Sequence, residues 1–409
     1  MALSIVSRDG ARFAQYRTAH AAEEDVRWNK NEVERRARKL MSRSWMKASA
    51  AGILSRTGMD KVVGALSGHR RLPVVIGYHR VVEDFASSAE MSIPSMLVSL
   101  RMLERHLDWI GHRFQFVSLD ELGARLDSGD GLDKPIAAIT FDEGYRDFYS
   151  HALPLLKKKG VPAAVFVVTD LVGTTTAQTH DKLYLMLMRR FGDRELMAND
   201  VAELLQRLGI LLPNGTVTAT AATPFLATRL LLEALSQADM QRVLTALESE
   251  DSISEDTFKP FYSLTWEMLA GIRRAGITVG SHTRTHVLMT NESRQKVMDE
   301  VVGSREELEK RLGTGVHHFV YPDGAFNTSS VNAVAAAGYR FGYTSCMHRD
   351  PKHPMLTVPR TVLWENSCLD SRGLFSGPVL NCHMHRAFDL VSGCRQSHTT
   401  SVEGANDRN

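Results

Sequence analysis

The chain has 409 residues, 43% of them hydrophobic and 23% charged, with a formal net charge of +2. This is the composition of an ordinary globular protein, and neither the charge nor any motif favours a nucleic-acid partner. No apolar run approaches the ~18 residues of a membrane span, and no secretory signal is visible at the start, so a cytoplasmic protein is the expectation.

Residues 1–68 are predicted to be a helical extension that precedes the main domain. The segment 27–47 holds eight basic residues and two glutamates, a net charge of +6, with Trp28 and Trp45 among them. One interpretation is a basic helix that makes weak contact with an anionic membrane surface. The favoured one is a solvated helix docked on the following domain, because its apolar face is thin.

From Pro73 onward, short apolar runs alternate with amphipathic segments, which predicts a parallel sheet covered by helices. Such a sheet is either open and doubly wound or closed into a barrel, and in both forms the chemistry gathers at the carboxyl ends of the strands. The expected strands are 73–77, 136–141, 163–168, 277–280, 318–321 and 339–345. The expected helices are 96–110, one opened by the Ser118–Glu121 capping box, 149–159, 266–274 and 292–312.

This alternation sets the expected domain organisation. Residues 69–365 form the main domain, and within it residues 171–262 show helical patterns without a clear strand pair. So long a connection is usually functional or a subdomain, and here it either walls the substrate cleft or only adds stability. Residues 366–409 are expected to be an irregular to disordered tail, since they grow polar toward the end.

Two pairs of polar residues follow predicted strands and are hard to explain by packing. Asp142 and Glu143 end the apolar run 136–141, and His282 and His286 follow the strand 277–280. Burying an ionised carboxylate is costly unless it is paired or binds a metal. Two carboxylates and two imidazoles on strand ends therefore make a divalent-metal hydrolase site the leading hypothesis.

Several motifs resemble, in the same order, those of the polysaccharide deacetylase family, the chitooligosaccharide-deacetylase-like carbohydrate esterases of the NodB-homology group. The similarity covers roughly residues 73–171 and 263–363. The resemblance implies a distorted (β/α) barrel of about seven strands, with the helical insertion and the N-terminal extension added. The three main motifs are Thr-Phe-Asp-Glu-Gly-Tyr-Arg-Asp at 140–147, His-Thr-Arg-Thr-His at 282–286 and Phe-Val-Tyr-Pro-Asp-Gly at 319–324, flanked by Tyr-His-Arg-Val at 78–81 and Leu-Thr-Val-Pro-Arg at 356–360.

The resemblance also implies roles. The first acidic residue of the motif, Asp142, is the general base, and Glu143, His282 and His286 are the metal ligands. Three protein ligands with an open position are typical of a catalytic zinc site, so zinc is the first candidate and other divalent metals stay open. Asp142 would take a proton from the attacking water, and the backbone N–H of Tyr145 would stabilise the oxyanion.

The chain departs from the family pattern at three points. The usual Asp-Asp pair is Asp-Glu here, and the extra methylene of Glu143 puts metal affinity or preference in question. The arginine that normally orients the base is missing from the third motif, so Arg360 is the candidate partner of Asp142. The family's closing histidine is not recognisable after Leu356, and His79, at the end of the first strand, is therefore the candidate general acid.

Other polar residues near the motifs receive weaker assignments. Tyr321, Asp323 and Arg146 are candidate substrate contacts, although Asp323 in Pro-Asp-Gly is first a turn residue. The Cys-His-Met-His run at 382–385 carries no further ligand pattern, and a second metal cluster there is not expected.

Three functions remain open on the sequence. The leading one is a metal-dependent hydrolase that removes N-acetyl groups from an amino sugar in a glycan, oligosaccharide or glycolipid. The second keeps the metal site but cleaves another carbon–nitrogen bond, in a non-sugar amide, imide or formyl group. The third is a catalytically inactive barrel that only binds glycans. Nothing in the sequence fixes the sugar or the oligomeric state.

Overall fold

The computed structural model describes residues 73–128, 135–191, 197–212, 223–251 and 253–388, together with Cys394 and His398. The predicted N-terminal extension, residues 1–68, and its basic segment 27–47 lie outside the described residues. Among the described helices, none is both long and apolar enough to cross a bilayer.

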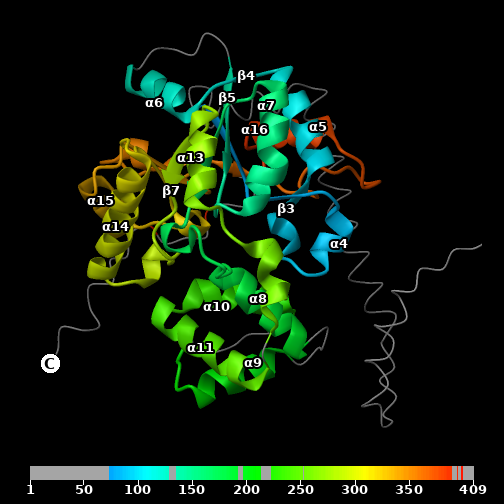
Figure 1. The fold of residues 1–409 in the computed structure, drawn as a ribbon, viewed down its shortest axis with the longest axis vertical. Coiled ribbons are helices and arrows are strands. Elements are labelled where there is room, and N and C mark those ends of the chain that lie inside the picture. The colour runs from blue at the N-terminus through cyan, green and yellow to red at the C-terminus, as the bar shows by residue number, and fades with distance from the viewer. Residues whose placement is uncertain are drawn as a thin grey trace, which may run out of the picture. The chain divides into compact units, whose positions relative to one another are not determined.

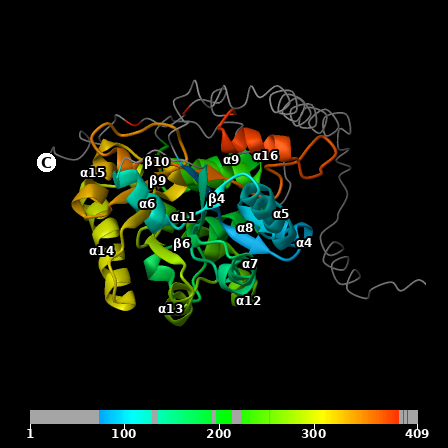
Figure 2. The ribbon, with the colours of Figure 1, turned by 90° about the horizontal axis from the view of Figure 1, so that it is seen from above.

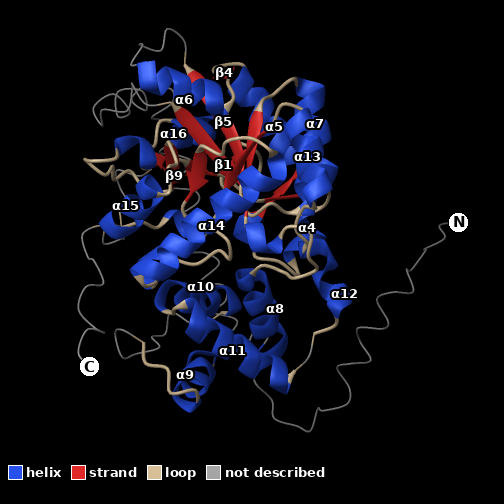
Figure 3. Ribbon diagram, turned by 60° about the vertical axis from the view of Figure 1, so that its left-hand side comes forward, coloured by secondary structure: helices blue, strands red, loops and turns tan. Residues whose placement is uncertain are grey.

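The centre of the fold is a ring of parallel strands, drawn in red in Figure 3. Its strand order is β10-β9-β8-β7-β6-β5-β1-β11, and β4 pairs with the start of β5. A separate pair, β2 and β3, lies beside it. The strands are β1 (Val74–Tyr78), β2 (Arg80–Val82), β3 (Leu97–Ser99), β4 (Gln115–Phe116), β5 (Ile136–Phe141), β6 (Ala163–Val167), β7 (Thr278–Ser281), β8 (His318–Val320), β9 (Phe341–Thr344), β10 (Val358–Pro359) and β11 (Thr361–Val362).

A single short segment, residues 358–362, almost closes the ring. Its first half, β10, pairs with β9, and its second half, β11, pairs with β1. Counted as one strand, this segment joins β1, β5, β6, β7, β8 and β9 in a nearly closed barrel, as expected, and not in an open doubly wound sheet. Arg360 stands between the two halves, at the seam of the barrel.

Helices cover the outside of the ring. Seen from above, α14 and α15 lie on one side and α4 and α5 on the other (Figure 2). A π-helical turn, Phe148–Ala152, precedes α7. The covering helices are α4 (Phe85–Ala89), α5 (Leu100–Gly111), α6 (Leu119–Ser128), α7 (Leu153–Lys159), α13 (Trp266–Arg274), α14 (Arg294–Leu312), α15 (Thr328–Ala336) and α16 (Gly377–Met384).

Alternate strand residues fill two separate apolar layers, as the period of two in a strand requires. Val75 and Ala138 belong to the cluster inside the barrel, whereas Ile76 and Ala137 belong to the cluster under the helices. Both faces are thus buried, which explains why the strands read as continuous apolar runs.

Residues 171–262 form the expected helical insertion, and its described part contains no strand. The helices gather at one end of the barrel in Figure 1. They enclose an apolar cluster of their own, which includes Leu187, Val201, Leu231 and Leu244. The insertion helices are α8 (Thr179–Phe191), α9 (Met197–Arg207), α10 (Pro224–Ala234), α11 (Gln237–Glu250) and α12 (Glu255–Phe258).

Two segments differ from the expectation. The helix predicted from residue 96 begins at Leu100, because Leu97–Ser99 pairs with β2 and the Ser99 hydroxyl caps α5 by accepting from Met102 N. The tail from residue 366 was expected to be irregular, but α16 lies within it. Ser376 caps this helix, and the buried Leu380 joins the main core.

Candidate active site

The residues predicted to form the site lie at the carboxyl ends of the barrel strands. His79 follows β1, Asp142 and Glu143 follow β5, and His282 follows β7. Arg360 reaches the same end from the seam of the barrel. Catalytic residues of (β/α) barrels gather at this end, because loops of different strands converge there.

Asp142 is held by a two-pronged contact with Arg360. The Arg360 Nη1 and Nη2 atoms donate to Asp142 Oδ1 at 2.8 Å and Oδ2 at 2.7 Å, and Nη1 also donates to Thr140 Oγ1 at 3.0 Å. Both side chains are buried. Burial would raise the pKa of Asp142, but the guanidinium holds it below its usual range. The contact expected of Arg360 is therefore present.

Replacing Arg360 with methionine is expected to destabilise the protein by about 3–5 kcal/mol at pH 7, because a buried carboxylate loses the guanidinium that pairs with it. The folded-state pKa of Asp142 is depressed, so its contribution to stability is present above the unfolded value of about 3.9 and is lost as the pH falls through the folded value. In the variant, burial raises this pKa instead. The difference in the free energy of unfolding between the wild type and the variant should therefore shrink as the pH falls.

Urea unfolding at pH 7 and pH 5 measures this effect. The matched control is Arg340→Met, which removes an exposed ion pair with Asp127 and should cost at most about 1 kcal/mol. If Arg360→Met loses as little unfolding free energy as the control, the buried ion pair does not hold Asp142 in place.

Glu143 occupies a strained turn directly after Asp142. Its φ is 70°, and that of Gly144 is also 70°. A Cβ on Gly144 would lie 2.7 Å from Val167 Cγ1, so only glycine fits there. This turn aims Glu143 Oε1 at two imidazoles, with 3.1 Å to His286 Nε2 and 3.5 Å to His282 Nε2.

The loop that carries the two histidines is fixed by hydrogen bonds. His282 Nδ1 lies 2.8 Å from Val320 O, and because a carbonyl only accepts, Nδ1 carries the hydrogen and Nε2 keeps its lone pair. The buried Glu300 carboxylate of α14 accepts from the backbone N–H groups of Arg284 and Thr285, between the histidines. These contacts set both the position and the tautomer of a candidate metal ligand.

Backbone strain is concentrated at this site. Five described non-glycine residues have positive φ, and only Arg386 lies outside the site loops. Each such residue costs about 1–3 kcal/mol and persists only when its surroundings impose it. The other four are Glu143, Thr283, His286 and Asp323.

The donor set fits a divalent ion. Glu143 Oε2 and His286 Nε2 are buried and have no hydrogen-bond partner among the described residues, although His286 Nε2 lies close to Oε1. Burial lowers the pKa of His286, but the Glu143 carboxylate raises it overall to about 9. Two ligands about 2.0–2.1 Å from a tetrahedral ion are about 3.4 Å apart, which agrees with the two Glu143–histidine distances.

The helical insertion adds a histidine that the sequence analysis missed. His180, in the first turn of α8, is buried, and one of its ligand nitrogens lies within 4.8 Å of ligand atoms of both Glu143 and His286. Its Nε2 lies 2.8 Å from the Tyr145 hydroxyl. The available signal was a His-Asp pair at the start of an apolar helix, because buried charged residues need a partner.

Both ends of the insertion hold the turn that carries Glu143. At the first end, the Gln178 side chain donates to Glu143 O at 3.2 Å, and the Tyr145 hydroxyl donates to Asp181 Oδ2 at 2.6 Å. At the second end, Leu264 N donates to Gly144 O at 2.8 Å. The insertion is therefore part of the site and not only an addition to the fold.

Tyr145 and Arg146 belong to this junction. The Tyr145 side chain is buried, and the predicted role of its backbone N–H in stabilising an oxyanion stays a prediction. Arg146 Nε donates to Ser263 O at 3.0 Å, and the guanidinium lies over the Tyr262 ring. These contacts tie Arg146 to the end of the insertion, and its role in binding substrate stays a prediction.

The third motif divides into a buried and an exposed residue. Tyr321 is 0% exposed and contacts the rings of Phe319 and Phe326, so its side chain belongs to the core, and the expected substrate contact stays a prediction. Asp323 is exposed, with a φ of 53°, and its charge acts on His286. Its predicted contact with substrate remains compatible with this position.

His79 stands among the charged groups of the site. Its side chain is half-buried, and Nδ1 has no hydrogen-bond partner among the described residues. Burial lowers the pKa of His79, against the opposing charges of Asp142 and Glu143. The role of His79 as the general acid stays a prediction.

Comparison with known proteins relates the central part of the chain to one group of enzymes. A family model described as polysaccharide deacetylase matches residues 129–217 and 221–342, more than half of the chain. A relative named poly-beta-1,6-N-acetyl-D-glucosamine N-deacetylase, from Staphylococcus epidermidis, is 29% identical over 110 residues, which are 25% of this chain and 38% of the relative. A putative polysaccharide deacetylase, YxkH of Bacillus subtilis, is 26% identical over 114 residues, 28% of this chain and 37% of the relative.

The chain thus spans less than two fifths of either curated relative. Among solved structures, IcaB from Ammonifex degensii matches with a TM-score of 0.47 and 17% identity, over 77% of this chain and 97% of that one. The Streptococcus pyogenes deacetylase PplD in complex with acetate matches with a TM-score of 0.45 and 17% identity, over 74% and 95%. On the extent of the family match, this chain belongs to the polysaccharide deacetylase family.

Proposed function

We propose that this protein is a divalent-metal-dependent hydrolase that removes N-acetyl groups from an amino-sugar oligo- or polysaccharide. One observation carries the proposal. A buried carboxylate, Asp142, is fixed by Arg360 directly beside a carboxylate–histidine set that has unpartnered donor atoms. The name of the Staphylococcus epidermidis relative supports an N-acetylglucosamine polymer as the substrate class.

Glu143, His282 and His286 would hold the ion, with His180 at its edge. Two imidazoles and a carboxylate make zinc the first candidate, although the same donors accept other divalent metals. When bound, the ion would polarise the acyl carbonyl and lower the pKa of a water molecule. Asp142, ionised at neutral pH because of Arg360, would accept the proton from the attacking water.

The leaving amine needs a proton, and His79 is the residue proposed to supply it. The charges of both Asp142 and Glu143 act on its imidazole, and His79 follows β1 at the same end of the barrel as these residues. The backbone N–H of Tyr145, in the turn that follows Glu143, would donate to the oxyanion. The two ends of the insertion keep this turn in place.

The glutamate at position 143 is compatible with activity. Its extra methylene would displace the carboxylate if the turn were the same as one built for aspartate. Here Oε1 already lies 3.1 and 3.5 Å from the two imidazole nitrogens. The inactive-barrel alternative is therefore less favoured than an active hydrolase.

A substrate panel tests the proposed function against the second hypothesis, cleavage of another carbon–nitrogen bond. Acetate release from chitooligosaccharides should exceed hydrolysis of small cyclic imides and N-formyl amines by the same metal-loaded protein. Asp142→Asn serves as the background for every substrate. Turnover of the imide or formyl compounds alone would replace the sugar substrate with another carbon–nitrogen bond.

Replacing His79 with alanine should reduce hydrolysis of an ordinary acetamide strongly, by about 10²–10⁴ if the general acid is lost. An acetylated substrate with a much better leaving group needs little protonation and should be affected far less. The measurement compares kcat/KM for the two substrates, with the bound metal determined in parallel. His112→Ala, at an exposed position, is the matched control. Equal losses on both substrates would restrict His79 to shaping the site.

A further inference from the structure

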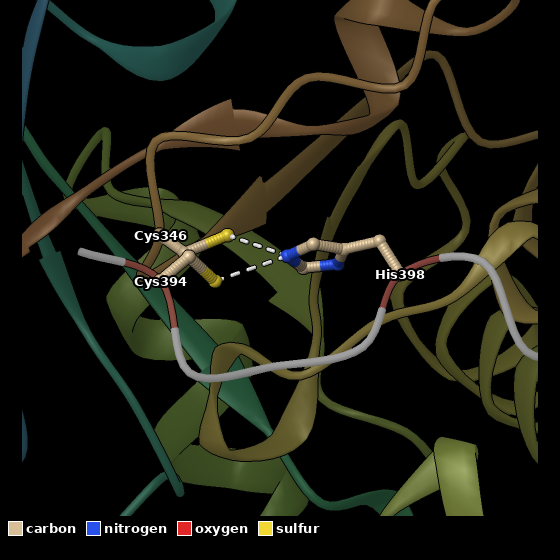
Figure 4. A group of neighbouring side chains, drawn as sticks. All are labelled: Cys346, Cys394 and His398. Atoms are coloured by element: carbon tan, nitrogen blue, oxygen red, sulfur yellow. Dashed lines mark hydrogen bonds between the residues drawn. The ribbon is translucent and has the colours of Figure 1, made fainter.

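A second cluster of metal-binding side chains lies outside the site described above. Figure 4 shows the side chains of Cys346, Cys394 and His398 directed toward one another. The distance to His398 Nε2 is 3.5 Å from Cys346 Sγ and 3.1 Å from Cys394 Sγ. The three ligand atoms all lie within 4.8 Å of one another, although Cys346 and His398 are far apart in the sequence.

A hydrogen bond fixes His398 in the tautomer that can bind a metal ion through Nε2. Its Nδ1 lies 2.9 Å from Phe326 O, so Nδ1 carries the hydrogen and Nε2 presents a lone pair to the two sulfurs. A backbone carbonyl on the far nitrogen is the usual support of a metal-binding histidine. The His398 ring also packs against two other rings. Its centroid lies 4.3 Å from that of Phe326 and 4.3 Å from that of His348, and the two imidazole planes are 7° apart.

The distances favour an ion over hydrogen bonds alone. One lone pair on Nε2 can satisfy only one of two thiols, and thiols are weak donors. With Zn–S near 2.3 Å and Zn–N near 2.0–2.1 Å, a sulfur and a nitrogen on a tetrahedral ion are about 3.5 Å apart. The two observed distances, 3.5 and 3.1 Å, lie close to this value.

We propose that Cys346, Cys394 and His398 bind a second ion, zinc, with the fourth position left to water or another small ligand. Thiolate and imidazole donors select zinc over the hard cations magnesium and calcium. Cys394 is exposed, and Cys346 and His398 are half-buried, so an ion can enter from solvent. The proposal does not depend on the deacetylase function.

The ion would join two segments at the rim of the barrel, the loop after β9 and the chain around Cys394 and His398. His398 O accepts from Thr328 N at 3.3 Å, at the start of α15, and Cys346 follows β9. The neighbouring Ser345 hydroxyl donates to Asp323 O at 3.2 Å. The site would therefore anchor the chain around Cys394 and His398 to the loops that carry Asp323.

Cobalt substitution of the full chain, kept under reducing conditions, tests the proposal. A cobalt ion bound by thiolates gives sulfur-to-metal charge-transfer absorption, which the nitrogen and oxygen ligands of the catalytic site cannot produce. We expect this band in the wild type and its loss in Cys346→Ser and Cys394→Ser. Each of these variants should also bind one zinc equivalent fewer than the wild type.

Two controls separate this site from the catalytic one. His286→Asn should lose the catalytic ion but keep the sulfur band, and Cys382→Ala, in α16, should keep both. Because the band is read on the folded wild type as well, a variant that fails to fold does not remove the test. Absence of the band in the wild type would overturn the proposal, and so would a Cys346–Cys394 disulfide in the reduced preparation.

Discussion

Replacing Asp142 with asparagine is expected to lower kcat for deacetylation by about 10²–10⁴, the usual contribution of a general base. The substitution keeps the size of the side chain and its contact with Arg360, but the amide cannot accept the proton. Bound metal should stay close to the wild-type level, because Glu143 and the two histidines are unchanged. The measurement pairs steady-state kinetics with metal analysis of the same preparation.

Asp127→Asn is the matched control, since Asp127 is an exposed aspartate that pairs with Arg340 at the surface. It should leave both the rate and the metal content unchanged. Loss of metal from Asp142→Asn, with Glu143→Gln still loaded, would mean that the roles of the two acidic residues are reversed.

Replacing Glu143 with glutamine, or His286 with asparagine, should remove the ion and with it nearly all activity. A bound ion that polarises a carbonyl supplies several kcal/mol of transition-state stabilisation, which corresponds to about 10³-fold or more in rate. The measurement is the dissociation constant for zinc by competition with a chelating dye, together with kcat.

Glu143→Asp separates the effect of the negative charge from that of the side-chain length. Aspartate restores the usual residue of the family and keeps the charge, so zinc binding should survive, with an altered affinity. The exposed Glu306→Gln is the neutral control. Full zinc affinity and full activity in Glu143→Gln would contradict the ligand set.

Much of the barrel could be predicted because its strands are buried on both faces and bounded by glycine or polar residues. The run Ile136–Phe141 and the helix Trp266–Arg274 have the predicted ends, and Thr265 caps the latter by accepting from Met268 N. The strands β2 and β3 were missed, because three residues are too few to show a period of two. The helix α15 was missed as well: its short, alanine-rich sequence has only a weak apolar face, although Asn327 and Ser330 form a capping box.

The site was predictable where motif residues follow strands, because parallel strands bring their carboxyl ends together. Asp142, Glu143, His79 and His282 meet for this reason. The contact of Arg360 with Asp142 depends on the closure of the barrel by residues 358–362, which a sequence can suggest but not establish. His180 was missed: its pairing with Asp181 at the start of an apolar helix marks it as unusual, but its place at the site depends on how an insertion of about ninety residues folds back onto the turn after β5.

The central claim is that metal bound by Glu143 and the two histidines drives removal of acetyl groups from an amino sugar. Its most direct test is acetate release from chitooligosaccharides by the full chain before chelation, after chelation and after return of zinc. Performing it also on Cys346→Ser excludes any contribution from the second ion. We expect acetate release to disappear on chelation and to return with zinc in both proteins. Undiminished release from protein shown to be metal-free would contradict the claim.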